Sequence, residues 1–159
     1  MHPRLFKLLA LSTALAMQAG CQTPQWRDAQ AGRPAMIAAI AAEPEGDYFI
    51  GRRFFKTEYK FWGFVRRPRQ SWSEAKLVML NEQSKLAPDR ETNTIGSDNG
   101  FEYRLYGKLS GDTVYEPASN GFYPEFVLRN YELSSRAPGA IFRSSNCLNP
   151  EVRIIPNPY

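Results

Sequence analysis

Histidine is almost absent from this chain, and its scarcity narrows the chemistry that the protein can perform. The only histidine among the 159 residues is His2, beside the amino terminus. Ser–His and Cys–His nucleophile pairs, histidine general bases and histidine-containing metal sites all need that residue. The two cysteines, Cys21 and Cys147, are too few for a cysteine-rich zinc site. We therefore expect a protein that is not an enzyme and that uses no cofactor or metal.

Long apolar segments are also lacking, which excludes an ordinary membrane-spanning helix in the sequence. The most apolar stretch, residues 8–17, is about half the roughly 20 residues that a helix needs to cross a bilayer. A basic head with Arg4 and Lys7 precedes it, and the small residues Ala19 and Gly20 follow it. This arrangement is typical of a secretory signal, so we predict that residues 1–20 are a signal peptide.

The end of this segment, "AGC" at residues 19–21, resembles the lipobox of bacterial lipoproteins. In that pattern small residues precede a cysteine, which is lipidated and becomes the first residue of the mature chain. The resemblance implies a fatty-acid anchor on Cys21. Because Gln22 is not Asp, it also implies an outer-membrane lipoprotein that faces the periplasm. Gln18 departs from the pattern, which usually has Leu there. Cleavage after "ALA" at residues 14–16 is the alternative, and it would give a soluble periplasmic or secreted protein.

The state of Cys147 depends on that anchor. If Cys21 carries lipid, Cys147 has no partner within the chain and is a buried thiol or a link between two chains. If Cys21 is not lipidated, a Cys21–Cys147 disulfide that ties the two ends together is the alternative.

The charge of the mature chain is close to balanced. Removal of residues 1–20 takes away Arg4 and Lys7, which leaves 18 basic residues against 16 acidic ones. A net charge this small gives no strong overall attraction to nucleic acid or anionic lipid. We therefore expect a membrane contact through the lipid anchor and a partner in the envelope, either a protein or a polysaccharide, but not nucleic acid.

The remaining sequence predicts a tether, one small domain and a tail. Residues 21–34 are polar with Pro and Gly, as in a flexible tether. Residues 35–42, "AMIAAIAA", predict a short helix at the start of a domain that covers residues 35–143. Residues 144–159 are rich in proline and predict a tail that packs along the domain or extends to bind a partner.

Strand patterns dominate the predicted domain, so we expect an all-β fold with five or six strands. Aromatic and β-branched runs occur at residues 47–55, 59–67, 75–82, 101–109, 112–116 and 124–133. Turn residues at 110–112 and 117–121 separate the later runs. Gly63 and Gly107 lie inside aromatic strands, where glycine marks a bulge or bend that helps a small barrel to close. The pattern over residues 47–133 resembles the OB fold, which implies a curved barrel.

Basic and aromatic residues are concentrated in "FIGRRFFKTEYKFWGFVRRPRQSW", residues 49–72. Strand alternation assigns most rings to the core, with Phe64 brought to the side of Tyr59 and Phe61 by a change of phase at Gly63. It places Trp62 and the bases outside, where they suit a sugar ring, a phosphate or a protein partner. The candidate binding residues are Arg52, Lys60, Trp62, Arg66, Arg67 and Arg69. The alternative is that this stretch is simply the core and the solvated side of two strands.

Carboxylates are the remaining side chains in the sequence that could catalyse a reaction. Two that converge in a cleft could hydrolyse an envelope glycan, although scattered Asp and Glu more often cover the outer faces of strands. Asp98 and Asn99 offer at most a loose calcium site. The leading interpretation is a non-catalytic envelope lipoprotein that presents a small β-barrel binding module. A carboxylate-dependent glycan enzyme and a structural assembly subunit are the alternatives.

Overall fold

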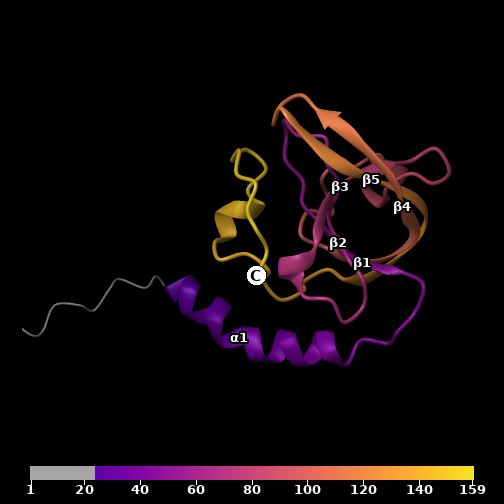
Figure 1. Ribbon diagram of the computed structural model, residues 1–159. Coiled ribbons are helices and arrows are strands. Elements are labelled where there is room, and N and C mark those ends of the chain that lie inside the picture. Colours follow the sequence, from indigo (N-terminus) through magenta and orange to yellow (C-terminus); the bar gives the residue numbers. More distant parts are fainter. Residues whose placement is uncertain (1–23) are drawn as a thin grey trace, which may run out of the picture.

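The computed structural model describes residues 24–159 and confirms the predicted fold class, a mainly β protein with a closed barrel (Figure 1). The predicted signal peptide and Cys21 lie outside the described residues. The strands are β1 (Phe49–Arg53), β2 (Gly63–Arg66), β3 (Lys76–Asn81), β4 (Glu102–Glu116) and β5 (Gly121–Ser135).

The strand order is that of an OB-like barrel. Around the barrel the order is β1-β2-β3-β5-β4, and it closes between β4 and β1. Neighbours are antiparallel except β3 and β5, which are parallel. The short helix α2 (Pro88–Glu91) lies between β3 and β4 in the chain, and 3-10 turns occupy η1 (Trp72–Glu74) and η2 (Ser145–Leu148).

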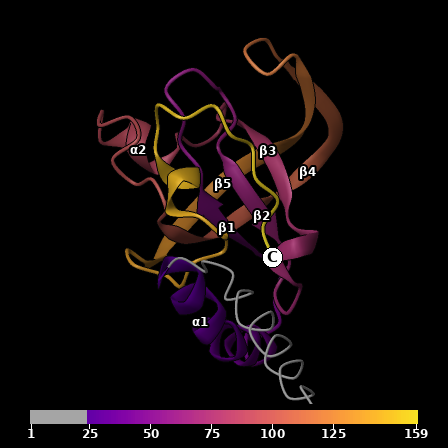
Figure 2. The ribbon, with the colours of Figure 1, turned by 90° about the vertical axis from the view of Figure 1, so that its left-hand side faces the viewer.

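Two of the predicted strands are in fact one, because no turn forms at residues 110–112. β4 continues through these residues and pairs with β5 on both sides of them. The extra residues instead form an irregularity between Leu109 and Thr113, with Gly111 at a φ of +98°. The predicted turn at 117–121 is confirmed in position, since it joins β4 to β5. The result is one long hairpin that projects beyond the barrel (Figure 2).

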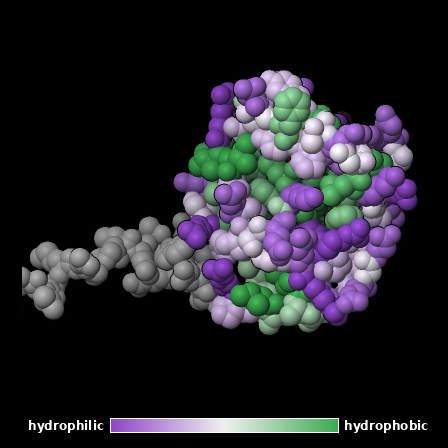
Figure 3. All heavy atoms as spheres, viewed as in Figure 1, coloured by the Kyte–Doolittle hydropathy of each residue, from purple (hydrophilic) through white to green (hydrophobic). Residues whose placement is uncertain are grey.

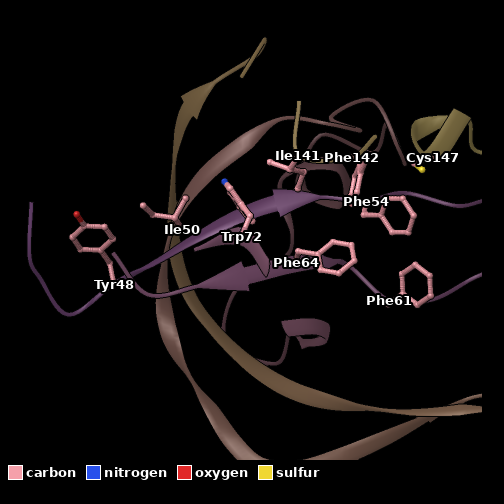
Figure 4. Close-up of a cluster of buried hydrophobic side chains, with 9 residues drawn as sticks. All are labelled: Tyr48, Ile50, Phe54, Phe61, Phe64, Trp72, Ile141, Phe142 and Cys147. Atoms are coloured by element: carbon pink, nitrogen blue, oxygen red, sulfur yellow. The ribbon is translucent and has the colours of Figure 1, made fainter. Parts of the chain in front are cut away.

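The core has two parts, one on each side of the barrel wall. Every strand contributes to the interior cluster, whose buried members are Phe49, Trp62, Val65, Val78, Ala87, Tyr103, Leu105, Phe126 and Leu128. The second, outer cluster covers the outside of β1 and β2 (Figure 4), and its buried members are Tyr48, Ile50, Phe54, Phe61, Phe64, Trp72, Ile141, Phe142 and Cys147.

The two predicted strand glycines are needed because the backbone approaches closely. A Cβ on Gly63 would lie 2.2 Å from the carbonyl oxygen of Arg52, and one on Gly107 would lie 2.2 Å from that of Val127. The pairing register shifts next to Gly107, which confirms the predicted bulge. Gly63 begins β2 instead of lying inside it. The predicted change of phase is nevertheless present, since Phe61 and Phe64 belong to the same outer cluster.

Helix α1 (Pro24–Ala41) is longer than the predicted helix, which began at Ala35. Pro34 lies inside it; a proline removes one backbone hydrogen bond, and here it does not end the helix. Met36 and Ile40 pack against the outer cluster. The predicted tether at 21–34 overlaps the first half of α1, and its role as a tether stays a prediction. Within residues 24–159 no helix combines the length and hydropathy needed to span a membrane.

The C-terminal segment, residues 139–159, packs back on the barrel. Ile141 and Phe142 are buried in the outer cluster, where the Phe142 ring lies 5.4 Å from that of Phe54. Lys56, itself buried, donates from Nζ to the carbonyl oxygen of Asn149 at 2.8 Å. Cys147 is a buried free thiol. The segment therefore forms a fixed cover over the outside of β1 and β2.

Candidate functional site

The predicted binding face on residues 49–72 is largely buried, so most of its residues cannot contact a ligand. Trp62 retains 3% of its surface, Arg52 5% and Arg66 2%. The outward placement of Trp62 is wrong: Trp62 lies opposite Phe61, as alternation predicts, but its side of the strand faces the barrel interior, where its ring lies 6.1 Å from that of Tyr103. Lys60 is exposed, as predicted.

The two buried arginines of this face are held by the chain itself. Arg52 donates to Glu102 Oε2 at 2.6 Å and to the carbonyl oxygen of Gly139 at 2.8 Å. Arg66 donates to Glu43 Oε2 at 2.7 Å. Both guanidinium groups lie over the ring of Trp72, at 5.1 and 4.5 Å. Burial lowers the pKa of Arg52, while its contact with Glu102 acts in the opposite direction. These charges compensate internal carboxylates and are not displayed to a ligand.

The two exposed arginines are also paired. Arg67 contacts Asp47 at 3.1 Å, and Arg69 contacts Glu45 at 2.6 Å. Exposed pairs of this kind contribute little to stability and exchange easily with solvent. Among the six candidate residues, the structure thus brings Arg52 and Arg66 together around Trp72 and leaves Lys60, Arg67 and Arg69 on the surface.

A buried ionic cluster links β1 to the segment between β3 and β4. Arg53 donates to Asp89 Oδ2 at 3.0 Å and lies 3.4 Å from Asp98 Oδ1. Tyr103 donates from its hydroxyl to Asp98 Oδ2 at 3.1 Å. Burial raises the pKa of the Asp98 carboxyl above its usual range, while Arg53 acts in the opposite direction. Burial and the nearby Asp98 carboxylate raise the pKa of Tyr103.

This cluster is a structural element, not a catalytic pair. Asp89 and Asp98 are 1% and 4% exposed, so a glycan has no access to them. The side chain of Asn99, the second residue of the loose calcium site considered above, is used within the chain. It accepts a hydrogen bond from the backbone N–H of Phe55 and donates one to the carbonyl oxygen of Leu148. Among residues 24–159 no group of His, Cys, Asp and Glu is arranged to hold a metal ion. The cluster instead fixes residues 83–100 to the barrel.

The tip of the β4–β5 hairpin, residues 113–124, is the surface that sequence reasoning missed. Phe122 is 69% exposed, the most of any large apolar side chain in residues 32–159, and Tyr115 is 46% exposed. The two residues are cross-strand partners, and their ring centroids lie 5.2 Å apart. The sequence "TVYEPASNGFYP", residues 113–124, could have indicated this surface, because it has aromatic residues on both sides of a turn and Glu116 as its single charged residue.

Glu116 holds this tip in a fixed shape. Its carboxylate is fully buried and accepts the backbone N–H of Ser119 at 2.7 Å and that of Ala118 at 3.2 Å. The backbone N–H of Lys60, in the loop between β1 and β2, also donates to it. Burial alone would raise the pKa of Glu116, but these hydrogen bonds together lower it. Because Glu116 is the only acid or base in residues 113–124, the tip displays no charge.

Comparison with known proteins adds no relative, since no protein-family model, curated protein or solved structure matches this chain.

Proposed function

We propose that this chain is a non-catalytic lipoprotein of the bacterial cell envelope whose barrel presents the β4–β5 tip to a partner. The observation that carries the proposal is the exposure of Phe122 and Tyr115 on a turn that Glu116 makes rigid. Exposed aromatics on a preorganised element lose little conformational entropy when they bind, and aromatics are frequent anchors of protein interfaces.

The arrangement of the molecule supports this role. Helix α1 lies at one end of the molecule and the hairpin tip at the other (Figures 1 and 2). The predicted anchor, Cys21, precedes α1 by only a few residues. A chain anchored there to the outer membrane would present the tip away from that membrane, into the periplasm. A soluble periplasmic or secreted form without the anchor is the alternative.

The chemistry of the tip favours an uncharged pocket on a protein partner. The tip projects from the barrel, so it suits a concave site better than a flat one. Residues 113–124 contain no cation for phosphate groups, and the exposed Lys60 of the adjacent loop is a small basic contribution, which argues against nucleic acid. A polysaccharide that stacks on the two rings is the alternative partner.

Crosslinking in living cells tests the tip. A photoreactive amino acid in place of Phe122 is expected to give a discrete adduct with one envelope protein, and Tyr115→Ser is expected to weaken that adduct. The matched control is the same reagent in place of Ile95, which is 66% exposed outside the tip. Equal adducts from both positions, or none from either, would contradict the proposal. A heterogeneous adduct that glycan hydrolases shorten would identify the polysaccharide instead.

Metabolic labelling with a fatty acid tests the anchor separately. The native chain is expected to carry the label and Cys21→Ala to lose it. An unlabelled native protein would remove the lipoprotein part of the proposal and leave the binding tip to be judged by crosslinking.

The glycan-enzyme alternative gains nothing from the buried pair Asp89 and Asp98, which share Arg53 as their ionic partner and are closed to solvent. The assembly-subunit alternative would require self-association, and the crosslinking experiment reports it as an adduct between two copies of the chain.

A further inference from the structure

Helix α1 carries a second apolar side that the barrel does not use. Pro34, Ile37, Ala38 and Ala41 follow each other at the spacing of one helical stripe, and we call this set the α1 stripe. Together with Arg33 they line a shallow depression that is open to solvent. Ile37 is 57% exposed. Figure 3 shows apolar surface at this end of the molecule, where α1 lies.

The inward side of the helix is already occupied. Met36 and Ile40 pack against the outer cluster, so the α1 stripe faces away from it. Residues 32–42 contain no acidic side chain, and Arg33 is their only charge. Its guanidinium lies over the ring of Tyr159, 5.3 Å from the centroid. An exposed apolar stripe with a cation beside it and no acid suits an interface with anionic lipid headgroups.

The chain outside the described residues indicates what covers this stripe. Helix α1 begins at Pro24, three positions after Cys21. Three residues span at most roughly 10 Å when fully extended. An acyl group on Cys21 would therefore hold the first turn of α1 close to the headgroups. We propose that the α1 stripe lies on the membrane surface as an interfacial helix, an inference that rests on the proposed anchor at Cys21.

The anchor explains why so modest a stripe is sufficient. Small side chains such as Ala38 and Ala41 bury little apolar area, so the stripe alone would bind a vesicle weakly. Tethering makes the contact intramolecular and raises the local lipid concentration enough to populate it. The helix would then fix the tilt of the barrel and keep the hairpin tip directed away from the membrane.

Spin labelling of the full-length, acylated chain tests this inference. In a Cys147→Ala background, a nitroxide is attached through Ile37→Cys or Ala41→Cys on the stripe, and through Ala39→Cys as control. Ala39 is exposed and, at 100° per residue, lies on the other flank of the helix. The protein is reconstituted in vesicles of phosphatidylethanolamine with a minor share of phosphatidylglycerol. Collisions with oxygen report lipid, and collisions with a water-soluble nickel chelate report water.

We expect an oxygen-to-nickel collision ratio several-fold higher at positions 37 and 41 than at position 39. The ratio at position 37 should fall to that at position 39 in Cys21→Ala, which lacks the anchor. High nickel access at all three positions would overturn the inference. So would low access to both reagents at positions 37 and 41, which indicates a second copy or another protein on the stripe. A chain without fatty-acid label that stays soluble would instead defeat the anchor itself, and this inference with it.

Discussion

Two aromatic regions of this molecule differ in their exposure to solvent. The stretch at residues 49–72 is rich in rings and in basic residues, and most of it is buried, on one side in the barrel interior and on the other under the C-terminal segment. The hairpin tip at residues 113–124 has fewer rings and displays no charge, yet it exposes Phe122 and Tyr115. The comparison shows that basic residues beside aromatics are weak evidence for a binding face. In this barrel they mark places where internal carboxylates are neutralised.

The largest expected effect comes from the buried side of the comparison. Arg53→Met removes the cation that Asp89 and Asp98 share. Because an uncompensated buried carboxylate is unfavourable, we expect a loss of about 3–5 kcal/mol in the free energy of unfolding, measured by urea denaturation. Burial already raises the pKa of Asp98 and Arg53 opposes that, so the variant should regain stability as the pH falls and Asp98 becomes protonated.

The matched control is Arg67→Met, which removes an arginine whose side chain is half exposed in its pair with Asp47. It should change the free energy of unfolding by no more than about 0.5 kcal/mol. Equal losses in the free energy of unfolding of Arg53→Met and Arg67→Met would show that the burial of Arg53 does not make its ion pairs more important for stability, and would contradict the prediction.

The second prediction compares the loss of stability on removing a buried ring, that of Phe142, with the loss on removing an exposed ring, that of Phe122. Phe142, at 5% exposure, contacts Phe54 and Phe64, so Phe142→Ala should lower the free energy of unfolding by about 3 kcal/mol. Phe122→Ala removes the same ring from the tip and should cost less than about 0.5 kcal/mol. The same denaturation measurement serves both. A large loss in Phe122→Ala would mean that the tip is folded onto the barrel in solution, and it would contradict its display to a partner.

The sequence predicted the barrel because strand chemistry is local. Alternating aromatics and the turn at 117–121 depend on neighbours within a few residues. The bulge at Gly107 could be predicted because glycine is unusual inside an aromatic strand, although the backbone that it approaches is that of Val127. The prediction of a binding face is wrong in part for a non-local reason, since Gly139 and Phe142 contact Arg52 and Phe64 from far along the chain. Trp72, at the end of the same stretch, lies under the guanidinium groups of Arg52 and Arg66. The prediction for Trp62 is wrong because it took the side of Phe61 and Phe64 as the barrel interior, whereas that side is the outer cluster and Trp62 faces the interior. The predicted turn at residues 110–112 is absent because β4 continues through these residues and pairs with β5 on both sides of them.

The smallest of the three effects concerns the carboxylate that makes the tip rigid. Glu116→Gln replaces one acceptor oxygen with an amide group that faces the N–H donors of Ala118, Ser119 and Lys60. We expect a loss of about 1–2 kcal/mol in the free energy of unfolding at neutral pH.

The pH dependence of that loss identifies its cause. The folded-state pKa of Glu116 lies below its ordinary value of 4.5, so its contribution is complete above about that pH and disappears as the pH falls through the lowered pKa. The difference between the native chain and Glu116→Gln should therefore shrink below pH 4.5. The titration of Asp98 is common to both proteins and cancels in this difference. Glu45→Gln, an exposed control, should change the free energy of unfolding at neutral pH by no more than about 0.5 kcal/mol. If the Glu116→Gln difference stays constant into acid, hydrogen bonds to the ionised carboxylate do not hold the tip, and the rigidity on which its display to a partner depends must have another source.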